Sequence, residues 1–346
     1  MRVTNSMMSN RLLTNINRNL GLLDKYNTQG STGKKIQVPS DDPIIASRSL
    51  KFRTMLSETE QYAKNASDAT SWIDATETVF VNMNNILEDM KGLMTQGAND
   101  TYTTEDRKKI LTEYNSLLEQ LEQELNSDYM GRNLFSGFRT DIKPIIKDNN
   151  GNNILNPEIY GQRGQLPIDG QYIEVQVGAG ITVPINSLAT DIYNQNDFNA
   201  LRGGVSGNTT EFKRIMDVLD SKVDVTLPDG STKRWNQMAE EEKLAWEKDP
   251  ANDIRGMMER TIKTIEDYQG KLSTQETDVG VRSKRVELVQ TRLEDDKLNY
   301  KNVMSENEDV NVAEVMMNLN AANAAYMASL NVGMKITQTT LADYLR

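Results

Sequence analysis

The sequence predicts a mainly α-helical protein with an inserted β-rich domain, in which helices from both chain ends build a long coiled-coil bundle. Two observations indicate this fold class. Apolar residues recur at helical spacing near both ends of the chain, while the middle is rich in Gly, Asn and Pro and contains short alternating runs. Helices therefore come from both termini, and the β structure lies between them.

Composition limits the functions that the chain can carry. It has 346 residues, a net charge of −11, and neither Cys nor His. The negative charge argues against a general nucleic-acid-binding protein, because phosphate contacts need clustered Lys and Arg. Without Cys, the chain has no disulfides and no thiolate metal sites. Without His, it lacks the most common general base. Plentiful Met (17 residues) and few aromatics (6%) suit adaptable helix packing.

The opening segment carries an apolar helical face. Its members are Met8, Leu12, Leu13, Ile16, Leu20 and Leu23. Residues 1–23 contain three Arg and no acid. On charge alone, we favour the interpretation that this is a solvated basic face. The other interpretation is that the segment is a terminal helix that pairs in an assembly. A secretory signal with a continuous apolar core is not visible, so we expect a cytoplasmic protein or one exported uncut.

Residues 30–50, GSTGKKIQVPSDDPIIASRSL, separate two helices. Gly30 and Gly33 break the first helix. Asp42 as N-cap and Pro43 as the first helical residue predict the start of the second. The expected helix-cap turn comprises Pro39, Ser40, Asp41, Asp42 and Pro43. Adjacent acids on a cap cannot flank a substrate as paired catalytic carboxylates do.

Apolar rows with a seven-residue period predict a helix from Ile44 to Thr95, on the order of 75 Å long. After a turn, Thr103 with Asp106 forms a capping-box pattern for the next helix. Further helical patterns run from Ile254 to Leu272 and from Val281 to Met304, the second with coiled-coil spacing.

The middle of the chain changes character from about Met130 to Ala200, where Tyr172 to Val177 alternate as in a strand. A helix at 211–222, a hairpin around 228–230 and a charged helix at 236–248 follow. We expect terminal coiled-coil helices at 1–30 and 310–346, a helical rod domain at 44–140 and 250–306, and a β-rich outer domain with a helical and hairpin insert at 141–249.

The closing segment carries no charge between Glu314 and Lys335. Val312, Val315, Leu319, Ala322 and Tyr326 recur at alternating +3/+4 spacing. This spacing indicates a coiled-coil seam, although an ordinary buried core helix has the same pattern. Four asparagines inside the run argue against a membrane span.

No catalytic, cofactor or metal site is predicted. Residues 148–152 resemble a calcium loop, but Gly stands at the fourth position and Ile159 replaces the closing Glu, so a turn is expected. Glycines at 161, 164 and 203–207 lack the strand–helix frame of a phosphate site and are expected to lie in turns. We therefore expect that the chain is not an enzyme. A carboxylate-based hydrolase in the β domain is the less favoured alternative, because no paired acids stand out in residues 141–200.

Several stretches resemble the flagellin superfamily. Residues 30–50 resemble its SGK-x-I…PSDDP signature, and residues 309–346 resemble its C-terminal helix. Residues 131–141, GRNLFSGFRTD, are similar to the G-x-x-L/F-F-x-G-x-x-T-D stretch of the hook-associated subfamily at the hook–filament junction. The segment from Tyr160 to Gly178 resembles the β domain that follows there.

The resemblance implies a structural protein of the bacterial flagellum that joins hook and filament by polymerising through its terminal helices. Filament flagellin is the alternative, and a cytoplasmic coiled-coil scaffold is less favoured. The implied partners are further copies in a ring or tubular layer, the preceding hook-associated protein, flagellin, and an export chaperone on the C-terminal region. Type III export without a cleaved signal and an extracellular location are also implied.

The resemblance implies neither a cofactor nor nucleic-acid binding nor a membrane span. Together with the apolar faces it predicts an assembly interface. The predicted interface comprises Met8, Leu12, Leu13, Ile16, Leu20, Leu23, Val312, Val315, Met316, Leu319, Ala322, Tyr326, Leu330, Ile336 and Leu341.

Overall fold

The structure, a computed structural model, describes residues 5–99, 102–147, 153–160, 171–192, 201, 211–226, 231–247 and 252–344. The chain divides into a terminal unit, Met1–Gln61 with Arg292–Arg346, and a central unit, Tyr62–Thr291. The calcium-like stretch 148–152, the glycines at 161, 164 and 203–207, and the turn at 228–230 lie outside the described residues.

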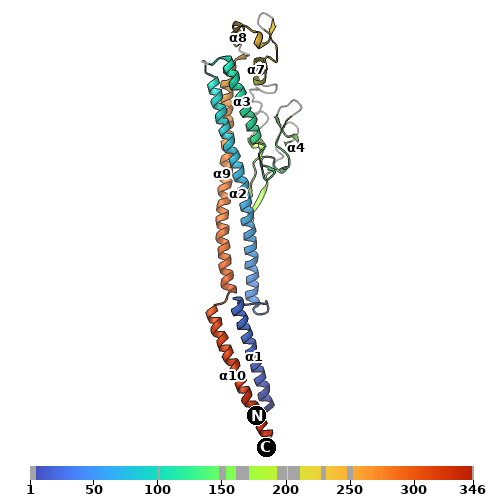
Figure 1. Cartoon of the computed structure of the whole chain (residues 1–346), viewed down its shortest axis with the longest axis vertical. Coiled ribbons are helices and arrows are strands. Elements are labelled where there is room, and N and C mark those ends of the chain that lie inside the picture. Colours follow the sequence, from blue (N-terminus) through green and yellow to red (C-terminus); the bar gives the residue numbers. More distant parts are fainter. Residues whose placement is uncertain are drawn as a thin grey trace. The chain divides into compact units, whose positions relative to one another are not determined.

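Two long helices contribute residues to both units, α2 (Pro43–Gly97) and α9 (Ile254–Glu308) (Figure 1). The two helical patterns expected at 254–272 and 281–304 are parts of the single helix α9. Gly270 and Gly280 do not end it, because Leu272 and Val279 are buried seven residues apart and packing continues past both glycines. Apolar burial on one side therefore outweighs the low helix propensity of glycine here.

The core of the central unit lies between α2, α3 (Thr104–Glu124) and α9. Its largest fully buried side chains include Phe80, Met83, Leu87, Met90, Met94, Leu111 and Tyr114. The three helices meet at Gly97, where an added Cβ would lie 2.6 Å from Met258 and 3.4 Å from Ile110. Thr103 accepts a hydrogen bond from the backbone of Asp106 at 3.3 Å, so α3 begins at the predicted cap.

The β structure consists of short antiparallel pairs, all within the central unit. In the described residues these are β1 (Asp128–Tyr129) with β2 (Arg132–Asn133), β3 (Ile145–Lys147) with β4 (Asn153–Leu155), β5 (Glu174–Gly178) with β6 (Ile181–Pro184), and β7 (Val225–Thr226) with β8 (Thr232–Lys233). The short helices there are α4 (Pro157–Tyr160), α5 (Ala189–Ile192), α7 (Glu211–Leu219) and α8 (Glu240–Glu247). The predicted fold class, mainly α with an inserted β-rich region, is confirmed.

The charged helix expected at 236–248 begins later in the structure, at Glu240. A 3-10 turn, η1 (Trp235–Gln237), precedes α8. The buried Trp235 ring packs edge-on against Trp246 with centroids 5.3 Å apart, and its indole N–H donates to Glu105 of α3 at 3.2 Å. These contacts hold the turn against α3, so the helix begins only after it.

A matched pair of substitutions on α2 tests where the core lies. Phe80 is fully buried and stacks on Phe135 with ring centroids 5.8 Å apart, whereas Val81 is 44% exposed. We expect Phe80→Ala to lower the free energy of unfolding by about 3–5 kcal/mol because it leaves a cavity. Val81→Ala should cost about 0.5 kcal/mol. Urea unfolding of both variants checks this, and equal losses would contradict the assigned core.

Candidate assembly surface

The terminal unit contains an antiparallel pair of helices, α1 (Asn5–Thr32) and α10 (Val312–Tyr344), with the two chain ends at the same end of the pair (Figure 1). Contacts along the pair join Leu12 to Gly333, Asn19 to Ser329, and Gly30 to Val315. A Cβ added at Gly333 would lie 3.1 Å from Leu12 Cδ2, so this glycine allows the helices to approach closely.

Inward positions on both helices repeat with alternating spacings of three and four residues, as in a coiled coil. We call these positions the seam: Leu12, Ile16, Asn19, Leu23, Tyr26 and Gly30 on α1, and Val315, Leu319, Ala322, Tyr326, Ser329 and Gly333 on α10. All are buried or half-buried. The Asn19 side chain donates to Ser329 Oγ at 2.7 Å, a polar contact that helps to fix the register.

The same two helices carry a second apolar surface that is exposed. We call it the outer face: Met7, Met8, Leu13, Leu20 and Leu22 on α1, and Val312, Met316, Met317, Met327, Leu330, Val332 and Met334 on α10. These side chains are 36–67% exposed, and residues 315–334 carry no charge. A group of exposed apolar side chains on two paired helices indicates an interaction site.

The residues predicted as one interface fall into two groups. Leu12, Ile16, Leu23, Val315, Leu319, Ala322 and Tyr326 lie in the seam, whereas Met8, Leu13, Leu20, Val312, Met316 and Leu330 lie on the outer face. Ile336 and Leu341 belong to α10, but their side chains are outside the described set. The interface prediction therefore combined an intramolecular contact with a free surface.

Val312 corrects the predicted seam, because its side chain is 55% exposed. It lies one turn before Val315, which faces Gly30, and α1 ends at Thr32. Asn19 and Ser329 were missed because both are polar. Their +3/+4 spacing from the apolar seam residues was the signal that could have found them.

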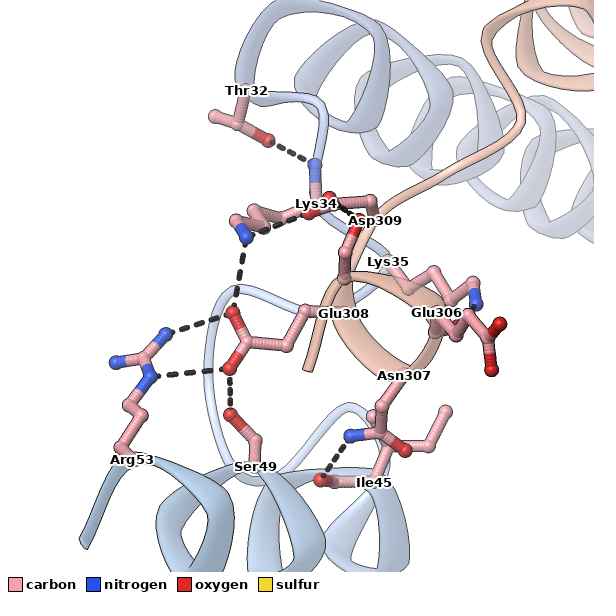
Figure 2. A network of polar contacts seen from close by, with 11 residues as sticks. Thr32, Lys34, Lys35, Ile45, Ser49, Arg53, Glu306, Asn307, Glu308 and Asp309 are labelled. Atoms are coloured by element: carbon pink, nitrogen blue, oxygen red, sulfur yellow. Dashed lines mark hydrogen bonds and ion pairs between the residues drawn. The ribbon is translucent and has the colours of Figure 1, made fainter. Parts of the chain in front are cut away.

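A polar cluster joins the break between α1 and α2 to the break between α9 and α10, all within the terminal unit (Figure 2). At its centre the Glu308 carboxylate, only 3% exposed, pairs with Lys34 Nζ at 3.1 Å and Arg53 Nη2 at 2.9 Å. Ser49 Oγ also donates to Glu308. We call Lys34, Ser49, Arg53, Glu308 and Asp309 the Glu308 cluster.

Backbone contacts reinforce this connection. Lys34 and Asp309 form an isolated antiparallel bridge, and the Lys35 N–H donates to the Glu308 carbonyl at 2.6 Å. The Val310 N–H donates to the Gly33 carbonyl at 3.0 Å. Gly33 takes a φ of +70°, the left-handed conformation that ends α1 with little strain. The two breaks are therefore held together by main-chain and side-chain bonds.

The cluster keeps Glu308 charged. Burial raises the pKa of its carboxyl, but hydrogen bonds from Arg53, Ser49 and Lys34 outweigh burial and lower the pKa to about 2. The hydrogen bond with Asp309 raises the pKa of Lys34. A buried, fully partnered carboxylate stabilises the fold and has no free lone pair aimed at a substrate.

The predicted helix-cap turn uses both of its acids structurally. Asp42 Oδ1 accepts from the backbone N–H groups of Ile44 at 3.0 Å and Ile45 at 3.1 Å, which caps α2 at Pro43. Asp41 Oδ2 accepts from the N–H groups three and four residues earlier, at 3.2 and 3.0 Å, and these bonds lower its pKa.

The described residues contain neither a candidate metal site nor a candidate membrane span. No group of three or more Asp or Glu side chains there is arranged to hold a metal ion. Among the helices in the part of the chain that the structure describes, none is both long and apolar enough to cross a membrane.

Residues 3–140 match the bacterial flagellin N-terminal helical region. This match covers the N-terminal part of the chain, from α1 through α3 to β2. Over nearly its whole length it is similar to flagellar hook-associated protein 3 of Escherichia coli (strain K12), with 25% identity over 341 residues that cover 95% of this chain and 96% of that protein. The resemblance to the hook-associated members of the superfamily is confirmed.

Two solved structures show the same fold. A Vibrio parahaemolyticus protein described as flagellar hook-associated superposes with a TM-score of 0.57 at 20% identity, covering 78% of this chain and all of that chain. The flagellar junction protein FlgL of Legionella pneumophila superposes with a TM-score of 0.50 at 13% identity, covering 77% and 100%. The similarity to a flagellin of Clostridium tyrobutyricum, at 29% identity, extends over only 41% of this chain and 38% of that flagellin.

Removing the charge of Glu308 should destabilise the fold. We expect Glu308→Gln to lower the free energy of unfolding at pH 7 by about 2–3 kcal/mol, less than for a fully buried pair because Lys34 and Arg53 remain partly exposed. Glu306→Gln, an exposed neighbour on α9, should cost about 0.5 kcal/mol or less. Urea unfolding measures both, and an unaffected Glu308 variant would contradict the cluster's role.

Acid should reduce the stability difference between the wild-type chain and Glu308→Gln. The folded-state pKa of Glu308 is lowered from 4.5 to about 2, so its contribution is present above pH 4.5 and is lost as pH falls toward 2. That contribution amounts to roughly 3 kcal/mol. The stability gap between the wild-type chain and Glu308→Gln should therefore shrink between pH 5 and pH 2. A gap that stays constant over this range would rule out the ionised carboxylate as its source.

Proposed function

We propose that this chain is a structural protein of the bacterial flagellum that forms the junction between hook and filament. In this proposal, copies of the chain assemble through the outer face of α1 and α10. The observation that carries it is the helix pair itself, whose seam is covered within the chain while its uncharged outer face is exposed. The near full-length similarity to a hook-associated protein supports the junction role.

Burial of the outer face can supply the free energy of assembly. Fully burying a Leu or Met side chain is worth about 1.5–3 kcal/mol. Outer-face side chains are roughly half exposed, so each one that an assembly covers contributes on the order of 1 kcal/mol. Several such contacts offset the loss of translational and rotational freedom, about 4–15 kcal/mol on association.

The seam and the outer face have different roles in the proposed assembly. The seam pairs α1 with α10 inside one subunit and presents their exposed sides together. The outer face then contacts neighbouring copies of the chain. It also contacts the preceding hook-associated protein on one side and flagellin on the other. The C-terminal region, with its uncharged apolar stretch at 315–334, suits an export chaperone before assembly. The expected domain boundaries belong to this proposal, with 141–249 as the outer domain.

Location and chemistry follow from the same role. The protein would act outside the cell in the flagellum, exported with α1 retained, because removing α1 would leave the α10 half of the seam uncovered. We assign it no enzymatic activity. The acids singled out in the sequence, Asp41 and Asp42, are occupied by backbone N–H groups.

Filament flagellin is the nearest alternative, and deleting the gene separates the two. Loss of a junction protein leaves hooks intact while flagellin leaks into the medium. Loss of filament flagellin leaves neither a filament nor leaked flagellin. The near full-length similarity to the hook-associated protein of Escherichia coli, against partial matches to flagellins, favours the first result.

Charging the outer face should mimic the deletion. In the deletion strain, a chain with Met327→Glu and Leu330→Glu should be exported yet fail to restore filaments, because assembly would bury unpaired carboxylates. Both the variant and flagellin should then appear in the medium. The control Met130→Glu, at an 84% exposed position in the central unit, should restore filaments. Motility restored equally by both variants would refute assembly through the outer face.

A further inference from the structure

The outer face is rich in methionine. Six of the 17 methionines lie on it: Met7, Met8, Met316, Met317, Met327 and Met334, each 42–67% exposed. The core of the central unit holds another group, Met83, Met90, Met94, Met257 and Met258, each 0–1% exposed. The chain therefore separates accessible thioethers at its terminal helices from inaccessible ones in its core.

We infer that the outer face is a site of methionine oxidation by peroxide, and that oxidation there blocks subunit assembly. This inference rests on the proposed function. In the reaction the thioether sulfur attacks hydrogen peroxide, the O–O bond breaks, one oxygen joins the sulfur as a sulfoxide, and the other leaves as water. Sulfur is oxidised by two electrons and the peroxide is reduced. The chain has no Cys, so thiols do not compete for the oxidant.

The sulfoxide changes the chemistry of the outer face and leaves the seam untouched. It converts an apolar, flexible side chain into a polar one, and burying that polar oxygen without a hydrogen-bond partner is unfavourable. Residues 315–334 carry no charged donor, and the side chains of the outer face are themselves all apolar. No methionine occupies a seam position, so α1 and α10 stay paired after oxidation. The oxidised subunit is folded but cannot bury its outer face.

Accessibility is tested first on the purified full-length chain. Limiting hydrogen peroxide followed by mass spectrometry should show the six outer-face methionines oxidised roughly ten-fold faster than the five core methionines. Met130, 84% exposed in the turn between β1 and β2, serves as an exposed control outside the outer face and should react as fast. Uniform oxidation of all these positions would overturn the inference.

The effect of oxidation on assembly is tested in the strain that lacks the gene. Cells carry an inducible copy of the wild-type chain, of a variant with all six outer-face methionines changed to Leu, or of Met130→Leu. The chain is induced during a peroxide pulse, and newly formed filaments are counted. We expect the six-Leu strain to form filaments while the other two form few. If no chain restores filaments without peroxide, the proposed function fails. If all restore them without peroxide and peroxide prevents all of them equally, only the inference fails.

A second measurement uses the wild-type chain alone, in case the six-Leu variant does not fold. After the pulse, the chain is recovered both from sheared flagella and from the medium. Sulfoxide at the six positions should be at least about five-fold enriched in the medium, because oxidised subunits are excluded from assembly. Sulfoxide at Met130 should be equal in both fractions. Equal enrichment at all seven positions would contradict the inference.

Discussion

Two paired helices can cover only one side of each other, and the terminal unit is organised around this constraint. The seam between α1 and α10 uses Leu, Ile, Tyr and small residues at coiled-coil spacing, so one stripe of each helix is satisfied within the chain. The apolar residues of the outer face, beyond that stripe, are 36–67% exposed. A stable soluble helix pair would carry charges there. Residues 315–334 carry none, so the surface suits burial between subunits.

The Glu308 cluster gives this helix pair a defined starting point. It bonds the chain just after α1 to the chain just before α10, and Arg53 and Ser49 attach both to the first turns of α2 (Figure 2). Since Glu308 is buried and fully partnered, the two breaks cannot separate without exposing or stranding a charge. The cluster thus fixes where α1 ends and where α10 begins, which in turn sets which residues meet across the seam.

Local patterns predicted much of this fold from the sequence. Repeats of three, four and seven residues located the long helices, and the Asp42–Pro43 start was visible because caps depend on adjacent residues. The Glu308 cluster was not predictable in this way, because Lys34 and Arg53 are far from Glu308 along the chain. The predicted interface mixed seam with outer face for a related reason. Spacing shows that Leu319 and Met316 are both apolar, but only the partner helix decides which of them is covered.

Single-cysteine labelling can show whether the outer face is buried between subunits, because the natural chain contains no Cys. Met327→Cys places a thiol on the outer face, and Met130→Cys places one at an exposed site in the central unit. Each is treated with a maleimide as purified monomer and within intact flagella. We expect both thiols to react in the monomer, and we expect assembly to protect Met327→Cys but to leave Met130→Cys reactive. Equal reactivity of Met327→Cys in monomer and flagella would contradict this expectation.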